Sequence, residues 1–365
     1  MKFSCSKEVI LSAVSIAAKA ASAKSAVAAL EGLLLELTES NLTITGYNLE
    51  IGIKTDINVT GTEDGSAVIN AKMLSEVIRK MPSGIIDISV DEKCAYISQG
   101  ATELMIMCMS GEEYPPIPQA NLEGGFTVPQ KVLKSMIVQT KYACATIDTK
   151  PALTGCLFEI KEGTLNVVAV DGIRIALRQE PISCEDTSFI VPARTLEELV
   201  HLLSDEDDKM VTVAVERNQI SFKIDSYTMI SRLVTGEFLD YRKHLGFQET
   251  FTAKVKCREI IDVLDRSMLF LNDKNKSPLR CEFNDGSLNI SCSTTLGKIN
   301  DKINIEYNGT PITIGFNAKF LLDAFKAADT DTVNILLTSS AVSPVMIVPT
   351  EGKEFTFFLL PMRLK

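Results

Sequence analysis

Two cysteines and two histidines are the side chains best suited to nucleophilic chemistry. A thiol hydrolase needs a cysteine activated by a histidine, and the candidates are Cys144 or Cys156 with His201 or His244, the only histidines present. Nothing in the sequence places these groups together, and no oxyanion-type motif accompanies them. An enzyme is therefore one hypothesis, which loss of turnover on mutation of His244 would favour.

The sequence gives little support for a metal site or a nucleotide-binding site. The acidic run at residues 204–208 (SDEDD) lies between an expected helix and the strand VTVAV, which favours a solvated turn over a metal site. His201 ends that helix, where a capping or surface role is more common than metal ligation. The motifs HExxH and GxGxxG are absent, and Gly297-Lys298 is no phosphate loop because Cys292 replaces its first glycine. We expect no cofactor, no metal and no catalytic residue.

One arginine stands in an apolar setting. In VVAVDGIRIALR, residues 167–178, Asp171-Gly172 signals a turn between two apolar runs. Arg174 follows between Ile173 and Ile175. It is either a structural arginine that bridges two domains or a polar group at an apolar binding surface.

Composition describes a soluble globular chain. The 365 residues are 45% hydrophobic and 23% charged, which suggests two or three domains. No run of eighteen apolar residues exists, so we expect no membrane span. Residues 9–18 mimic a secretory signal, but Lys7 and Glu8 interrupt it, which favours an amphipathic helix. Nine scattered cysteines without a CxxC pair fit a reducing cytoplasm.

The chain repeats one layout three times. Helical spacing at 7–24, 130–141 and 258–271 is followed by the related strand pairs ELTESNLTI, EIKEGTLNV and EFNDGSLNI. In each copy a second helix follows a short strand, as in SAVINAKMLSEVIRKM. We predict an α+β fold of three domains at 1–120, 125–243 and 249–365, each with two helices packed on antiparallel sheets. Repetition without a catalytic motif favours architecture over catalysis.

Charge is segregated within a net total of −10. The six expected helices carry 15 basic and 8 acidic residues, so the remainder carries −17. If the helices share one surface, that surface attracts phosphate. The alternative is that these lysines decorate solvated helix faces. Because Trp is absent and aromatic residues are few, any nucleic-acid contact should be to the backbone, without sequence reading.

Several segments together resemble the bacterial DNA polymerase III beta subunits, the β sliding clamps. They are the MKF start, LTGCLFEI (153–160), AVDGIRIA (169–176), FIVPAR (189–194), GEFLDYRK (236–243), IGFNAKFLLD (314–323) and the LLPMRLK end. The resemblance covers the whole chain. It implies a head-to-tail homodimer, a ring around double-stranded DNA that tethers the replicative polymerase for processive synthesis.

The resemblance also implies roles for particular residues. The dimer interface would use Leu104, Ile106, Leu269 and Phe270, which could instead be ordinary core residues. The DNA-facing candidates are Lys24, Lys72, Lys141, Arg194 and Lys319, for each of which a solvated surface role is the alternative. A β-rich interaction scaffold without DNA is the competing class; a clamp on circular duplex should resist high salt and fall off when the circle is cut.

A peptide groove between the second and third domains is a further implication. It would receive segments of the polymerase, the clamp loader and other proteins with a clamp-binding motif. In this groove Gly172 would keep the floor open, and Arg174 would stay partly exposed and donate to peptide carbonyls. Ile173, Val170, Leu239, His244 and Gly246 depart from the family pattern, and Lys365 would extend toward the groove mouth. The groove residues are Leu153, Val170, Gly172, Ile173, Arg174, Ile175, Leu239, His244, Val342, Ser343, Pro344, Leu360, Pro361, Met362 and Arg363.

Overall fold

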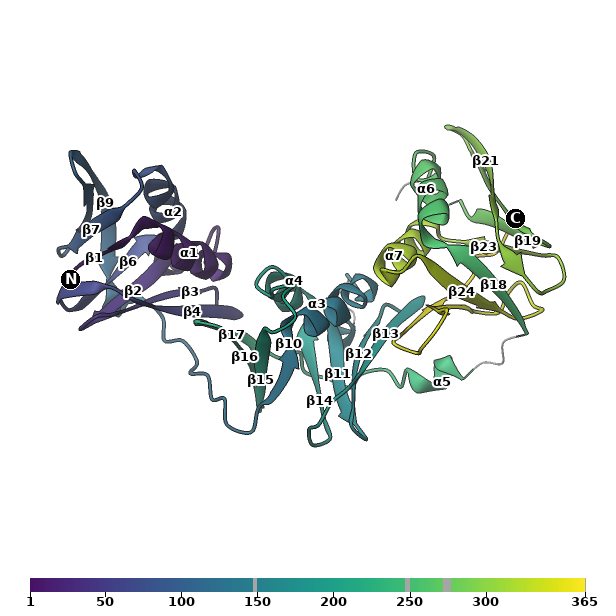
Figure 1. Cartoon of the computed structure of the whole chain (residues 1–365), viewed down its shortest axis with the longest axis horizontal. Coiled ribbons are helices and arrows are strands. Elements are labelled where there is room, and N and C mark those ends of the chain that lie inside the picture. The colour runs from purple at the N-terminus through teal and green to yellow at the C-terminus, as the bar shows by residue number, and fades with distance from the viewer. Residues whose placement is uncertain (147–149, 247–249, 272–276, 365) are drawn as a thin grey trace. The chain divides into compact units, whose positions relative to one another are not determined.

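The computed structural model describes residues 1–146, 150–246, 250–271 and 277–364 (Figure 1). The chain folds into two compact units, one made of residues 1–131 and 198–233 and the other of residues 132–197 and 234–365. The middle of the chain therefore contributes to both units. Within the described residues, no helix combines the length and apolar character needed to cross a membrane.

The first repeat alternates strands with two α-helices. Its elements are β1 (Lys2–Ser6), α1 (Lys7–Ala17), β2 (Gly32–Thr38), β3 (Asn41–Tyr47), β4 (Ile51–Asn58), β5 (Thr60–Glu63), β6 (Gly65–Asn70), α2 (Ala71–Lys80), β7 (Ile85–Val90), β8 (Cys94–Gln99) and β9 (Thr102–Ser110).

The second repeat has the same order with fewer strands. Its elements are β10 (Phe126–Pro129), α3 (Gln130–Val138), the 3-10 turn η4 (Lys141–Ala143), β11 (Gly155–Lys161), β12 (Thr164–Val170), β13 (Arg174–Pro181), β14 (Thr187–Pro192), α4 (Ala193–Val200), β15 (Met210–Glu216), β16 (Gln219–Ile224) and β17 (Tyr227–Arg232).

The third repeat follows the short helix α5 (Arg242–Leu245). Its elements are β18 (Phe251–Lys256), α6 (Cys257–Ser267), β19 (Leu279–Asn284), β20 (Ser287–Thr294), β21 (Gly297–Asn304), β22 (Glu306–Tyr307), β23 (Ile312–Phe316), α7 (Ala318–Ala328), β24 (Thr332–Leu337), β25 (Val345–Pro349) and β26 (Phe355–Leu359).

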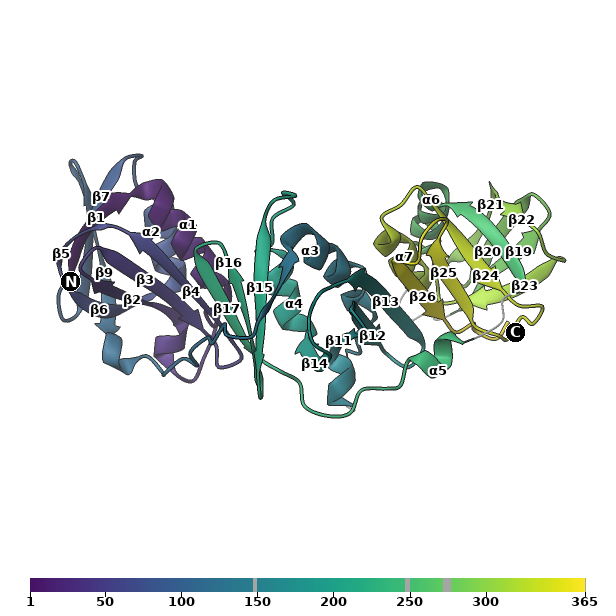
Figure 2. The same ribbon diagram turned by 60° about the horizontal axis from the view of Figure 1, so that its bottom comes forward.

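All strand pairs in the described part of the chain are antiparallel, as the repeat pattern predicts. The first unit contains one sheet ordered β10-β15-β16-β17-β4-β3-β2-β6-β9-β8-β7-β1-β5. The second unit contains β14-β11-β12-β13-β26-β25-β24-β18-β22 and a smaller sheet β21-β20-β19-β23, and its strands can be followed in Figure 2. In both units a hairpin strand of one repeat pairs with the last strand of the next, β4 with β17 and β13 with β26.

The helices contribute buried side chains to the core. α1 packs on α2 and α6 packs on α7, and α1 buries Ile10, Ala13, Val14 and Ala17. The helix ends at Ala17, earlier than the expected residue 24, because a short 3-10 turn follows and Ala21 is extended. Asn70 and Asn317 cap α2 and α7 by accepting hydrogen bonds from first-turn backbone N–H groups.

Candidate functional site

An apolar cluster lies on one face of the large sheet in the second unit, where β13 meets β26. We name it the junction cluster, and Leu153, Phe238 and Leu245 pack against it. It brings side chains from both repeats together, because Ile175 pairs with Phe358 across the two strands. Its buried members are Ala152, Leu157, Val168, Val170, Ile175, Leu177, Ile190, Tyr241, Met346 and Phe358.

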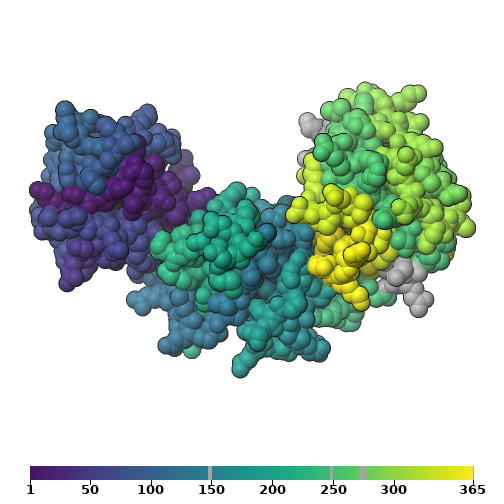
Figure 3. Space-filling view, in the orientation of Figure 1, coloured from purple at the N-terminus to yellow at the C-terminus, as the bar shows by residue number. Residues whose placement is uncertain are grey.

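Four exposed apolar residues lie within four positions along the chain of buried members of this cluster. Ile173 is 47% exposed, Val342 74%, and Leu239 and Leu360 39% each. The C-terminal strands, of which the last ends at Leu359, form part of the surface of the second unit, drawn yellow in Figure 3. Such a group of apolar side chains at a strand seam can receive the apolar anchors of a partner segment. We call these four residues the junction surface.

Backbone hydrogen bonds hold the C-terminal segment beside the Asp171-Gly172 turn. The Leu360 N–H donates to the Ile173 carbonyl at 3.0 Å, and the Met362 N–H donates to the Gly315 carbonyl at 2.8 Å. Gly315 permits this close approach, because a Cβ there would lie 2.5 Å from the Met362 carbonyl oxygen. Residues 360–362 are therefore fixed by one hydrogen bond to each repeat.

The remaining predicted groove residues differ in burial. Leu153 and Val170 belong to the junction cluster or pack on it, and Gly172 has φ +90° with open space beside it. His244 and Arg363 are exposed. Ser343, Pro344, Pro361 and Met362 are half-buried. Lys365 lies outside the described residues.

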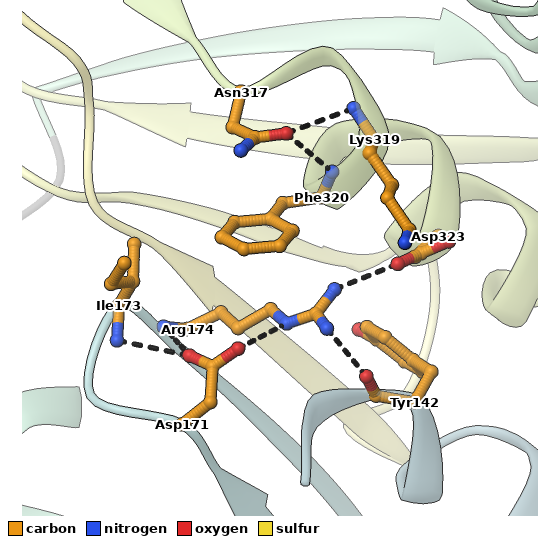
Figure 4. Close-up of polar contacts among 8 residues, drawn as sticks. All are labelled: Tyr142, Asp171, Ile173, Arg174, Asn317, Lys319, Phe320 and Asp323. Atoms are coloured by element: carbon orange, nitrogen blue, oxygen red, sulfur yellow. Dashed lines mark hydrogen bonds and ion pairs between the residues drawn. The ribbon is translucent and has the colours of Figure 1, made fainter. Parts of the chain in front are cut away.

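The expectation that Arg174 is partly exposed is wrong. Only 8% of the residue is exposed, and its guanidinium points to the helical side of the sheet (Figure 4). Nε and Nη1 donate to the carboxylates of Asp171 and Asp323, both at 2.8 Å, and Nη2 donates to the Tyr142 carbonyl at 2.6 Å. The guanidinium also lies 4.1 Å from the centre of the Phe320 ring. The structural alternative, an arginine bridging two repeats, is what the geometry supports.

The period of a β-strand explains this difference. Alternate residues of β13 point to opposite faces, so Ile175 and Leu177 join the junction cluster while Arg174 and Arg178 face the other way. That alternation is visible in the sequence. The partner Asp323 is not, because it lies on α7, 149 positions away.

Several members of the site were missed by sequence reasoning. Leu177 could have been found from its spacing to Ile175. Met346, Phe358 and Tyr241 reach the cluster only through the pairing of β13 with β26 and through the segment before α5. No local sequence signal reports such pairings.

Tyr241 and its neighbour fasten the segment between the second and third repeats. The Tyr241 hydroxyl donates to Glu159 at 2.8 Å, and Arg242 forms a two-pronged ion pair with the same carboxylate. The hydrogen bond from Arg242 lowers the pKa of Glu159, with Tyr241 adding to the effect. Beside these groups a cavity of about 600 Å³ is lined by polar side chains, among them Asn166 and Gln179.

The corresponding seam in the first unit is built differently. Register aligns Ile51 of β4 with Arg174 and Gly52 with Ile175. Asn48 forms the same turn as Asp171, its side chain accepting hydrogen bonds from the Glu50 and Ile51 N–H groups at 3.0 and 2.8 Å. Ile117 of the inter-repeat segment packs over Gly52 and its cluster, so this seam is covered by the chain itself.

The predicted DNA-facing residues occupy related positions. Lys72, Arg194 and Lys319 are each the second residue of their helix, as the repeated layout predicts, and all three are exposed. Lys24 is exposed in a segment after α1, whereas Lys141 is half-buried and paired with Glu197 at 3.4 Å.

The segregation of charge is weaker than the sequence suggests. Within their observed bounds, the six longer helices carry 11 basic and 8 acidic residues, because Lys19, Lys24, Lys141 and Lys256 lie outside them.

The four predicted dimer residues fall into two groups. Leu269 is 74% exposed and Leu104 38%, while Phe270 is half-buried against Gly297. Ile106, in contrast, is 8% exposed and belongs to the core of the first repeat, so its side chain contributes to that core and not to a surface. The apolar side chains that β9 does expose are Leu104, Met105 and Met107.

The candidates for chemistry lack a suitable environment. Cys144 and Cys156 are buried with their sulfurs 3.5 Å apart, and the hydrogen bond between them together with burial raises the pKa of the Cys144 thiol, which disfavours a nucleophilic thiolate. Residues 204–208 form an exposed turn in which Asp207 pairs with Lys131. Among the residues described, no cluster of His, Cys, Asp and Glu could hold a metal ion.

Comparison with known proteins identifies the fold. Three family models match consecutive parts of the chain: the N-terminal (1–118), central (127–240) and C-terminal (247–363) domains of the DNA polymerase III beta subunit. The beta sliding clamp of Halalkalibacterium halodurans is 28% identical and that of Staphylococcus aureus Mu50 is 27% identical, with at least 99% of both chains covered in each case.

Solved structures give the same result. The DNA polymerase sliding clamp from Bacillus subtilis superimposes with a TM-score of 0.94 at 25% identity over the full length of both chains. A sliding clamp from Pseudomonas aeruginosa, determined bound to griselimycin, gives 0.93 at 25% identity, again over both full chains. The fold is thus that of a three-domain, non-catalytic clamp. The chain belongs to the DNA polymerase III beta-subunit family, the sliding clamps that act as processivity factors for that polymerase.

Proposed function

We propose that two copies of this chain close head to tail into a ring around duplex DNA and carry the replicative polymerase along it. Partner proteins, among them the polymerase and the clamp loader, bind through short peptides at the junction surface. The ring need not grip DNA tightly, because enclosure replaces affinity. The chain works in the cytoplasm, in keeping with its nine free cysteines.

Peptide binding rests on the apolar seam between β13 and β26. Ile173, Val342 and Leu360 are exposed, and each lies within four positions along the chain of a buried member of the junction cluster. Each apolar anchor of a bound peptide that becomes fully buried there contributes about 1.5 to 3 kcal/mol. The seam of the first unit lacks this property, because Ile117 covers it. This contrast is the observation that carries the proposal of a single peptide site per chain.

Ring closure rests on two strand edges. Among the described strands, the only part of β9 that β6 pairs with is Cys108–Ser110. The earlier part of β9 therefore has β8 on one side and no strand on the other. In the third repeat β21 is the end of its sheet. Exposed edges invite pairing. We propose that the β9 edge, with Leu104 and Met105, meets the β21 edge of a second chain, with Leu269 and Phe270 beside it.

DNA contact rests on the cations at helix starts. Lys72, Arg194 and Lys319 are equivalent in the three repeats, so three equivalent positions for binding phosphates are available from each chain. Lys24 is a further candidate, whereas the ion pair with Glu197 makes Lys141 a weaker one.

The domain boundaries that we propose for these repeats remain 1–120, 125–243 and 249–365.

Native mass spectrometry with peptide titration tests this function. We expect a species of twice the 39.9 kDa chain mass that binds two copies of a labelled peptide taken from the organism's own replicative polymerase. Replacement of Ile173 by Asp should abolish binding, and the same change at Leu49, an exposed residue of the first unit's turn, should not. A monomer at micromolar concentration, or equal effects of the two changes, would contradict the proposal.

A further inference from the structure

Arg174 joins three separate segments of the second unit. Its guanidinium donates to Asp171 in its own turn, to the Tyr142 carbonyl in η4 and to Asp323 on α7. The rings of Phe320 and Tyr142 lie 4.1 and 5.3 Å away, so the charge is enclosed by aromatic as well as polar groups (Figure 4). A cation so placed needs all its partners, since an unpaired buried charge is costly.

The turn itself does not require this arginine. In the first unit Asn48 forms the same turn, and Ile51 occupies the position of Arg174. The internal repeat thus provides a natural comparison in which the turn persists without a guanidinium. Arg174 must therefore serve something present only at the second seam, and its partners there belong to η4 and α7.

A continuous set of hydrogen bonds leads from α7 to the junction surface. Asp323 binds Arg174, which binds Asp171, whose other carboxylate oxygen accepts from the Ile173 N–H at 3.0 Å. The carbonyl of Ile173 in turn accepts from the Leu360 N–H at 3.0 Å. Two of the four residues of the junction surface, Ile173 and Leu360, therefore lie at the end of this connection.

The helix that carries Asp323 belongs to the third repeat, and the turn belongs to the second. At its C-terminal end α7 is also bonded to the second repeat, because the Gln139 side chain donates to the Ala328 carbonyl at 3.3 Å. The third repeat is thus attached through α7 at two points. Of these, only the bond at Asp323 is also linked to the turn that carries Ile173.

We infer that Asp323 is a positioning residue for peptide binding: through Arg174 it holds the Ile173 turn and the Leu360 segment in the arrangement that receives a partner peptide. This inference rests on the proposed function of the junction surface. Asp323 itself touches no peptide, because its carboxylate is on the opposite side of the sheet from the junction cluster. It sets the affinity of the site by fixing the geometry in advance.

The test compares three single variants in the full-length dimer. Asp323→Asn keeps the shape and removes the charge, and Asp323→Glu keeps the charge. Asp265→Asn is the matched control, because Asp265 on α6 forms a surface ion pair with Lys326 on α7, the helix that carries Asp323. Fluorescence anisotropy with the labelled polymerase peptide should show affinity about 10-fold lower for Asp323→Asn, partial recovery in Asp323→Glu and no change in the control.

A double-mutant cycle and hydrogen exchange separate positioning from general stability. In an Arg174→Ala background, Asp323→Asn should have no further effect on peptide affinity, and the single variant should speed exchange of the Leu360 amide while leaving amides of β19 and β20 unchanged. Equal affinity of Asp323→Asn and the control, or full additivity with Arg174→Ala, would overturn the inference. If the wild type binds no peptide, the proposed function fails. In that case, unchanged hydrogen exchange of the Leu360 amide in Asp323→Asn would also overturn the coupling between Asp323 and the Leu360 segment.

Discussion

The carboxylate of Asp323 and the guanidinium of Arg174 lie 2.8 Å apart although 149 residues separate them along the chain. The pair joins the second and third repeats at a place where the side chain of Arg174 is only 9% exposed. Such a pair differs from the surface ion pairs elsewhere, because the guanidinium cannot return to bulk water without moving a helix or a turn.

Replacement of Arg174 by Ala should therefore destabilise the second unit by about 3 to 5 kcal/mol, because it leaves the carboxylates of Asp171 and Asp323 without their shared partner. Arg174→Lys should restore only part of this stability, since one ammonium group cannot reproduce the planar geometry in which the guanidinium donates to three partners. Urea unfolding measures both. Arg280→Ala, which removes an exposed pair with Glu282, should cost less than about 1 kcal/mol. Equal decreases in the free energy of unfolding for Arg174→Ala and Arg280→Ala would contradict a larger contribution from the buried pair.

Gly315→Ala should loosen the C-terminal segment. The added methyl group would stand 2.5 Å from the Met362 carbonyl oxygen, so residues 360–364 must shift. We expect faster hydrogen exchange at the Met362 amide and a several-fold loss of peptide affinity. Gly246→Ala is the control, because a methyl group there meets nothing within 4 Å. Unchanged exchange at Met362 would mean that the segment is not held at this glycine.

The Glu159–Arg242 pair should make stability depend on pH in the acid range. The hydrogen bond from Arg242 lowers the pKa of Glu159 in the folded state, so its contribution is present above the ordinary glutamate pKa and is lost as pH falls through the lowered value. Because Arg242 is exposed, the contribution is at most about 1 kcal/mol. The difference in stability between wild type and Glu159→Gln should shrink between neutral pH and about pH 3. A constant difference would contradict this.

Charge reversal at the equivalent helix starts should weaken DNA binding without changing partner binding. For Lys72→Glu and Lys319→Glu we expect the dependence of log K on log salt to become shallower by about 0.9 for every phosphate that the variant no longer neutralises. Lys353→Glu makes the same change in net charge on an exposed hairpin and should leave the slope unaltered. Identical slopes of log K against log salt for all three variants would contradict contact between the helix starts and DNA.

Leu269→Asp should weaken dimer formation. Leu269 is 74% exposed in the single chain, and burying it against a second chain would make an introduced carboxylate costly. We expect the dissociation constant of the dimer to rise at least about 10-fold, roughly 1.4 kcal/mol, by sedimentation. Val27→Asp changes a residue of comparable type that is 43% exposed and should have no effect. An unchanged dimer dissociation constant for Leu269→Asp would contradict the placement of Leu269 in the dimer interface.

Local patterns in the sequence predict most of the elements but not their long-range partners. The Asp171-Gly172 turn, the helix starts at Lys72 and Lys319 and the threefold layout all depend on neighbours within a few residues, and each is found in the structure. The partition of the middle repeat between two units depends on strand pairing, which no local signal encodes. Ile106 illustrates the same limit: an apolar residue on an edge strand can face either the core or a partner, and here it faces the core.

Arg174 shows what a family pattern can and cannot supply. The pattern predicts an arginine that donates to a bound peptide at the apolar seam, yet the side chain of Arg174 points to the other face of the sheet, as the period of β13 requires. The decisive partner, Asp323, belongs to a helix whose approach to β13 exists only in the folded chain.

Retention on circular DNA tests enclosure most directly. Protein loaded onto nicked circular duplex by a clamp loader should remain bound at a salt concentration that abolishes phosphate binding, and it should be lost within minutes after a single restriction cut. Release from the intact circle at the same rate as from the cut molecule would contradict a closed ring.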